Sequence, residues 1–130
     1  MARARVFIVE DDPIFVKLLE RVLDDGKLTP YETYTSGEEC IENLHHNPKL
    51  VLLDFSLGGL NGLDVLKIIK EQSPKTEVIM LIAVEDEAVK QKCLDEGAAD
   101  YINKNPNGLE YMRDKVIPKY RGGGLFSFLR

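Results

Sequence analysis

Three short apolar runs of the chain are each followed by side chains that could bind a cation or a phosphoryl group. Each run has the composition of a buried strand, and in an open parallel sheet the carboxyl ends of neighbouring strands converge on one crevice, where ligands bind. Crowded carboxylates repel one another, so this set favours a hard divalent cation, and an ammonium group beside it suits a phosphoryl group. The side chains are Glu10, Asp11, Asp54 and Lys104.

The acids at 10–12 and Lys104 also have a plainer, structural interpretation. Acids after a first strand are common helix caps, which would account for 10–12 without any chemistry. A lone lysine such as Lys104 is more often a solvated surface residue. Asp54 is harder to explain as structural, because a carboxylate directly after four buried aliphatic residues is costly unless it is paired or binds a cation.

Hydrophobic patterning predicts that strands and helices alternate five times along the chain. On the first helix, Ile14, Leu18, Leu19 and Val22 form the apolar stripe that we expect to face the core. Pro30 places the second strand at a sheet edge, and the run 78–84 is the most apolar and is predicted to be central. The predicted strands are 5–9, 29–35, 50–53, 78–84 and 101–102, and the predicted helices are 13–23, 36–47, 61–72, 87–96 and 109–119.

This alternation with short connections indicates parallel strands joined by right-handed crossovers. The predicted fold class is therefore α/β, a three-layer α/β/α sandwich. We predict one domain over residues 1–120 and a flexible glycine-rich tail over 121–130. The apolar segment 125–129 leaves three interpretations open: a docking peptide, the start of a longer segment, or an end that folds back on the domain.

Composition excludes several classes of partner. With 44% hydrophobic and 30% charged residues the chain is an ordinary globular protein, and its net charge of -5 argues against a nucleic-acid-binding surface. Cys40 and Cys93 fall in predicted helices and are expected to be buried free thiols in a reducing compartment. The apolar stretch behind the basic N-terminus is too short for a signal peptide, and no run could cross a membrane. We therefore expect a cytoplasmic protein that binds neither nucleic acid nor membrane.

As a set, the motifs resemble the receiver domain of two-component response regulators. The resemblance covers roughly residues 4–120 and implies a flavodoxin-like, five-stranded parallel sheet in the order 2-1-3-4-5 with five helices. It also implies a phosphoacceptor without turnover, and therefore not an enzyme in the usual sense. The matching segments are VFIVEDDP at 6–13, LVLLDFSLGGLNGLDVL at 50–66, VIMLIA at 78–83 and GAADYINK at 97–104.

The resemblance implies a role for each residue of the predicted site. Asp54 would accept a phosphoryl group from a phosphohistidine on a sensor histidine kinase or phosphotransfer protein, and Lys104 would contact the phosphoryl oxygens. Tyr101 would be the aromatic switch side chain, and the small Ala83 fits its position near the phosphoryl group. Mg²⁺ would be held by Glu10, Asp11, Asp54 and the backbone carbonyl of Ser56, with Asp11 the more direct ligand of the acidic pair.

The chain departs from the family pattern at Ile82, where the family has Thr or Ser. Isoleucine cannot donate a hydrogen bond to a phosphoryl oxygen, and its branched side chain occupies the space into which Tyr101 would move. Lesser departures are Gly58 and Asn105, each where the family usually has proline. Ile82 supports a second hypothesis, a degenerate receiver that binds a partner constitutively without phosphorylation-driven switching.

Two further classes fit less well. A flavodoxin-like cofactor binder would need a phosphate cradle rich in Ser, Thr and Gly after the first strand, where this chain has acids. A phosphatase with an aspartate nucleophile would need a second aspartate two residues after Asp54, where this chain has Ser56.

Overall fold

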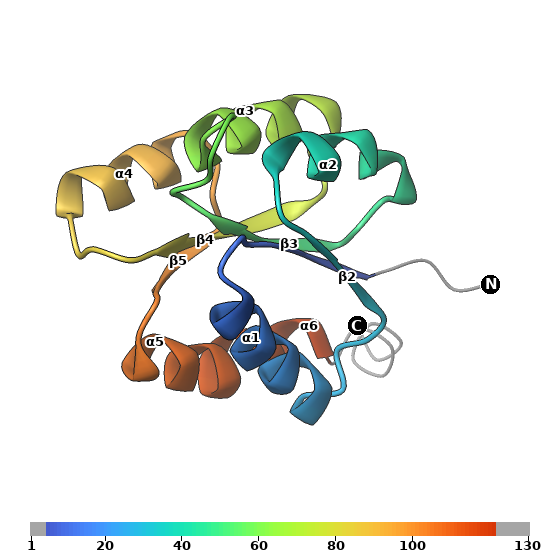
Figure 1. The fold of residues 1–130 in the computed structure, drawn as a ribbon, viewed down its shortest axis with the longest axis vertical. Helices are drawn as coiled ribbons and strands as arrows, with labels where there is room; N and C mark the ends of the chain where they lie inside the picture. Colours follow the sequence, from blue (N-terminus) through green and yellow to red (C-terminus); the bar gives the residue numbers. More distant parts are fainter. Residues whose placement is uncertain (1–4, 122–130) are drawn as a thin grey trace.

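A central parallel sheet lies between two layers of helices in the computed structural model, which describes residues 5–121 (Figure 1). The apolar segment 125–129 lies outside the described residues. All neighbouring strands pair in parallel, and the sheet order is β2-β1-β3-β4-β5, which confirms the predicted fold class. The strands are β1 (Val6–Val9), β2 (Tyr31–Tyr34), β3 (Leu50–Asp54), β4 (Glu77–Ile82) and β5 (Asp100–Asn103).

The helices α2, α3 and α4 cover one face of the sheet, and α1 covers the other together with the C-terminal helix (Figure 1). That last helix runs from α5 through a π-helical turn, η2, into α6. The bounds are α1 (Pro13–Asp25), α2 (Gly37–Glu42), a 3₁₀ turn η1 (Leu44–His46), α3 (Gly62–Gln72), α4 (Glu87–Asp95), α5 (Pro106–Tyr111), η2 (Met112–Val116) and α6 (Ile117–Arg121).

Two hydrophobic cores form because successive side chains of a strand point to opposite faces. The strands β1, β3 and β4 are buried on both faces, so they read as continuous apolar runs. The core under α2, α3 and α4 includes Phe7, Val9, Val51, Leu53, Met80 and Ile82. The core under α1 and the C-terminal helix includes Val6, Ile8, Leu50, Leu52, Leu81 and Ile102.

The predicted apolar stripe of α1 is partly wrong. Ile14 is 74% exposed and Leu18 is 41% exposed, whereas Phe15, Leu19 and Leu23 are buried. Two apolar stripes run side by side along this helix, and periodicity alone does not choose between them. The packing of α1 on the sheet buries the stripe that carries Phe15. Asp12 caps the start of the helix by accepting a hydrogen bond from the Ile14 backbone N–H.

Three other predicted boundaries differ from the structure. The strand β4 ends at Ile82, and Val84 is 73% exposed because the chain has already left the sheet there. The helix α2 ends at Glu42 and continues only as a 3₁₀ turn. The last helix begins at Pro106, because the Asn105 side chain caps it by accepting a hydrogen bond from the Gly108 backbone N–H at 2.7 Å.

Candidate functional site

The residues predicted to form the site lie at one edge of the sheet and on one side of it. Glu10, Asp54 and Lys104 each follow or close a strand at its carboxyl end. Each also lies two residues after a side chain that belongs to the core under α1 and the C-terminal helix. Because side chains along a strand alternate between its two faces, all three are directed toward that core. The carboxyl ends of the parallel strands therefore converge as predicted. The alternation of side chains along each strand determines on which face of the sheet the three groups meet.

Lys104 joins the two buried carboxylates. Its Nζ lies 2.8 Å from Glu10 Oε1 and 3.5 Å from Asp54 Oδ2. The Glu10 residue is fully buried and Asp54 is 2% exposed, while the lysine side chain is 14% exposed. The ammonium group also lies 5.1 Å from the ring centroid of Phe15 on α1. The amine is therefore held between the acids and an aromatic ring, and it can still reach the surface.

The position of Asp54 is fixed by its own backbone surroundings. The Ser56 backbone N–H donates a hydrogen bond to Asp54 Oδ1 at 3.0 Å, and Ser56 itself is exposed. The first residue of α3, Gly62, packs directly on this turn. A Cβ at Gly62 would lie 2.4 Å from the Asp54 carbonyl oxygen and 2.6 Å from Phe55 Cα, so only glycine lets the helix approach this closely.

The electrostatics of the site favour binding a cation. Burial raises the pKa of Glu10 to about 7, although the hydrogen bond from Lys104 acts in the opposite direction, and the nearby Asp54 charge raises it further. Burial would lower the pKa of Lys104, but the hydrogen bond to Glu10 and the charge of Asp54 outweigh it, so this pKa lies above its ordinary value. The lysine therefore stays an ammonium group, and one ammonium does not fully compensate the acids.

Three carboxylates are close enough to share one metal ion. Ligand oxygens of Glu10, Asp11 and Asp54 all lie within 4.8 Å of one another. Asp11 is exposed whereas the other two are buried, so a cation held here would lie at the mouth of the crevice. Carboxylate oxygens with room for water suit Mg²⁺, which keeps several of its own waters. The donor set fits this ion, and Ser56 lies at the rim of the same site.

A family model described as "Response regulator receiver domain" matches residues 6–116. This chain belongs to that family. The match spans all five strands and reaches the end of the π-helical turn, so the receiver domain accounts for nearly all of the described structure.

Curated relatives of this receiver domain are longer proteins with different names. A cyclic di-GMP phosphodiesterase of Thermotoga maritima is 34% identical over 89% of this chain and 31% of its own length. The DNA-binding transcriptional regulator NtrC of Escherichia coli K12 is 35% identical over 80% of this chain and 22% of its own length. The chain thus spans about a third or less of these relatives, and their named activities are those of the longer proteins.

Solved structures of other proteins have the same fold as this receiver domain. The response regulator DrrB of Thermotoga maritima superposes with a TM-score of 0.77 at 27% identity, covering 88% of this chain and 51% of that one. The signal receiver domain of a LuxO repressor protein described as putative, from Vibrio parahaemolyticus, gives a TM-score of 0.81 with 98% of both chains covered. At 23% identity the second likeness shows the fold alone.

The residues predicted for the switch of this receiver domain lie on the other side of the sheet from Lys104. Ile82 is 3% exposed and belongs to the core under α4, and Tyr101 is half-buried against that same core. Ala83 is exposed beyond the end of β4. The switch role of these three residues stays a prediction, but Ile82 and Tyr101 do meet in one core.

Sequence reasoning missed Phe15 and Lys90, which contact functional candidates. Phe15 lies under the Lys104 ammonium group, and Lys90 on α4 lies 4.5 Å from the centroid of the Tyr101 ring. A lysine between Val89 and Cys93 on one helical face was the signal for the second contact. The first could have been found only by choosing the correct stripe of α1.

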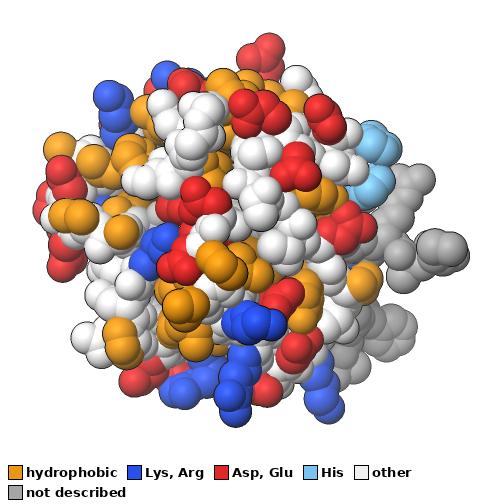
Figure 2. Space-filling view, in the orientation of Figure 1, with side chains coloured by type: hydrophobic (Ala, Val, Ile, Leu, Met, Phe, Trp, Pro, Cys, Tyr) orange, Lys and Arg blue, Asp and Glu red, His pale blue; other side chains and the backbone are white. Residues whose placement is uncertain are grey.

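The surface around the site combines charge with apolar side chains. Figure 2 shows acidic side chains around a basic one on the face where β1 leads into α1, bordered by hydrophobic side chains. On α1, Ile14 and Leu18 are exposed apolar residues. Within residues 5–121, none of the helices combines the length and apolar character that a membrane span requires.

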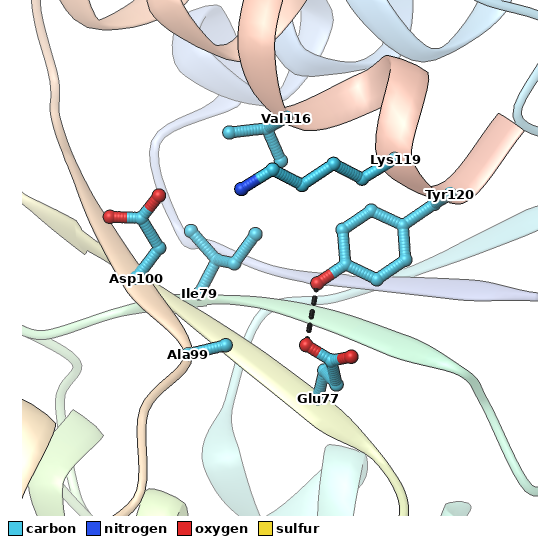
Figure 3. Close-up of a pocket in the computed structure, with 7 residues that line it drawn as sticks. All are labelled: Glu77, Ile79, Ala99, Asp100, Val116, Lys119 and Tyr120. Carbon is cyan, nitrogen blue, oxygen red and sulfur yellow. Dashed lines mark hydrogen bonds between the residues drawn. The ribbon is translucent and has the colours of Figure 1, made fainter.

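A cavity of about 230 Å³ lies at the opposite edge of the sheet (Figure 3). Glu77 and Asp100, the first residues of β4 and β5, line it with side chains of the C-terminal helix. Tyr120 donates a hydrogen bond to Glu77 Oε2 at 2.8 Å across it. This cavity lies at the amino ends of the strands, so it is separate from the carboxylate site. Beside it, the hydrogen bond from Tyr120 to Glu77 connects the last helix to the sheet.

Proposed function

We propose that this chain is a phospho-accepting receiver domain of a two-component or phosphorelay system, in which Asp54 takes a phosphoryl group from a partner histidine kinase or phosphotransfer protein. The observation that carries the proposal is the buried Glu10–Lys104–Asp54 arrangement at the carboxyl edge of the sheet. The domain would extend over residues 1–120, act in the cytoplasm and signal through protein contacts. Its net charge of -5 supports an output that does not use this domain to bind nucleic acid.

The chemistry proposed for Asp54 is an in-line displacement at phosphorus. A carboxylate oxygen forms a bond to phosphorus, the P–N bond of the phosphohistidine breaks, and the electron pair returns to the imidazole nitrogen, which then takes up a proton. The Ser56 N–H, bound to Asp54 Oδ1, orients the carboxylate so that Oδ2 faces the crevice near Lys104. The reaction is a transfer to the protein itself, so the domain takes part in it without turnover.

Charge neutralisation is the main task left to the other residues. Lys104 would move with little cost from its contact with Asp54 to an oxygen of the transferred group, because Glu10 holds its amine at 2.8 Å. Glu10, Asp11, Asp54 and the Ser56 carbonyl are the groups that would hold Mg²⁺. When bound, the ion neutralises charge on the phosphoryl oxygens and screens the carboxylates from one another.

Metal-dependent uptake of phosphoryl tests this function. We expect the purified chain, mixed with acetyl phosphate and Mg²⁺, to gain the mass of one phosphoryl group, and we expect EDTA to prevent the gain. Intact-mass spectrometry on briefly incubated samples measures both. If no mass is gained from acetyl phosphate, and no magnesium-dependent binding of beryllofluoride is seen either, the proposed function is wrong.

A constitutive binding module is the second candidate, and Ile82 is the observation that favours it. A phosphoryl group can shift a two-state equilibrium only through contacts that differ between the states. A hydroxyl-to-phosphoryl hydrogen bond would be such a contact, and Ile82, buried in the core that Tyr101 packs against, cannot make it.

Replacing Ile82 by threonine should therefore strengthen switching. The added hydroxyl supplies a charge-assisted hydrogen bond worth about 1.5–3 kcal/mol, and the smaller side chain gives Tyr101 room to turn inward. We expect beryllofluoride to cause larger NMR shifts around Tyr101 and α5 in Ile82→Thr than in the native chain. Ile82→Val, which removes bulk but adds no donor, is the matched control. Equal shifts in all three proteins would refute this account of Ile82.

A further inference from the structure

Lys90 is a lysine on the buried face of α4. Its side chain is only 5% exposed, and Cys93, one helical turn further, is fully buried on the same face. Lysine is almost never buried to this extent unless its charge is paired. The position is one that an apolar residue would ordinarily occupy, so the amine requires an explanation from its contacts.

The Lys90 amine joins two parts of the chain that are far apart in sequence. Its Nζ lies 2.7 Å from Glu85 Oε1, in the loop between β4 and α4, and 3.5 Å from Glu87 Oε1. The same atom lies 4.5 Å from the centroid of the Tyr101 ring on β5. The glutamate side chains are 68% and 84% exposed, so the amine lies beneath them and against the ring. These contacts form a link from loop to amine to ring.

We propose that Lys90 is a positioning residue for the aromatic switch: it ties the loop 83–86 to the Tyr101 ring, so that the two move together. This inference rests on the proposed function. The loop begins at the residue after Ile82, next to the phosphorylation site, so displacement of the loop reaches Tyr101 through Glu85 and Lys90. Charge contacts of Lys90 would then carry part of the coupling between the phosphorylation site and Tyr101. Ile82 cannot carry this part because it has no hydroxyl group.

A purely structural role for Lys90 predicts a different result. A lysine can cover apolar surface with its carbon stem while its amine makes weak surface ion pairs. The substitution Lys90→Met separates the two roles, because methionine retains an unbranched apolar side chain and loses the charge. The matched control is Lys92→Met, which removes the charge of an exposed lysine on the same helix.

The first arm of the test needs no phosphoryl group. A methylene next to the face of an aromatic ring is shifted upfield in proton NMR, so the ε-protons of Lys90 should be displaced in the native chain. We expect Tyr101→Leu to abolish this displacement and Lys92→Met to leave it unchanged. We expect Glu85→Gln to preserve it, because that substitution breaks only the loop half of the link. An ordinary ε-proton shift in the native chain would overturn the inference.

The second arm measures coupling with beryllofluoride and Mg²⁺ as the probe. In the native chain and in Lys92→Met, we expect resonances of the loop and of Tyr101 to shift together. In Lys90→Met and Glu85→Gln the loop should still respond, whereas the response of Tyr101 should be mostly lost. If Tyr101 responds in Lys90→Met as in the native chain, Lys90 only packs and the inference is wrong. If no resonance near Asp54 responds in any variant, the proposed function fails, and with it the signalling role of Lys90.

Discussion

A chain carrying Asp54→Ala takes up no phosphoryl group from acetyl phosphate and Mg²⁺, whereas Asp12→Ala takes up as much as the native chain. This is the expected result because the carboxylate of Asp54 is the nucleophile, and alanine offers no oxygen to form the bond to phosphorus. Asp12 lies at the same edge of the sheet, but its side chain accepts a hydrogen bond from the Ile14 N–H and caps α1. Its loss should cost about 1 kcal/mol of stability and no reactivity.

Lys104→Met extends the same experiment. Removing one preorganised charge from a transition state costs roughly 10²–10³ in rate. We therefore expect Lys104→Met to be phosphorylated slowly and not to be inert. Rates of mass gain for the three variants and the native chain give the comparison. Phosphoryl on the Asp54→Ala chain would mean that another residue is the acceptor, and an unchanged rate in Lys104→Met would remove the lysine from the proposed chemistry.

Magnesium should stabilise the fold, and this stabilisation should grow as the pH rises from about 5.5 to about 8. Burial raises the pKa of Glu10 from 4.5 to about 7, so the metal-free folded state holds a proton that the unfolded chain has released. The stability due to this proton is fully present below about pH 4.5 and is lost as the pH rises through about 7. A bound cation favours the carboxylate and replaces the proton, so its benefit is greatest where the proton is absent.

Thermal unfolding with and without Mg²⁺ at the two pH values measures this effect. A ligand at a hundred times its Kd adds about 2.7 kcal/mol, which is several degrees for a domain of this size. In Glu10→Gln the loss of metal-free stability with rising pH should be smaller, and in Asp54→Asn the gain from Mg²⁺ should be reduced. An unfolding temperature that does not respond to saturating Mg²⁺ at about pH 8 would contradict the assignment of the metal site.

The architecture and the position of the site can be predicted from the hydrophobic pattern of the sequence. Continuous apolar runs identify strands buried on both faces, and polar residues at their carboxyl ends must meet because the strands are parallel. This pattern predicts that Glu10, Asp54 and Lys104 converge, and the structure brings them together. Their chemical roles came from the family resemblance and remain proposals.

What the sequence did not reveal depends on rotations and pairings set by tertiary structure. Ile14 and Phe15 begin equally apolar stripes of α1, and only the packing of the helix on the sheet decides which stripe is buried. The sequence places Lys90 on the same helical face as apolar residues, but it does not identify Glu85 and Tyr101 as the partners of the amine. An asparagine directly before a proline is a pattern typical of a capped helix start, so the sequence itself indicates a helix from Pro106.

The π-helical turn in the last helix determines how β4 and β5 are held. Tyr111, before the turn, donates a hydrogen bond to Asp100, and Tyr120, after it, donates one to Glu77. Residues nine apart in an uninterrupted α-helix lie about half a turn away from each other, on opposite sides. The wider π-helical turn reduces the angle between Tyr111 and Tyr120 around the helix axis. One helix can therefore donate hydrogen bonds to the first residues of two adjacent strands. β5 is an edge strand that leads to Lys104, so the hydrogen bond from Tyr111 to Asp100 holds the amino end of the strand that positions the lysine.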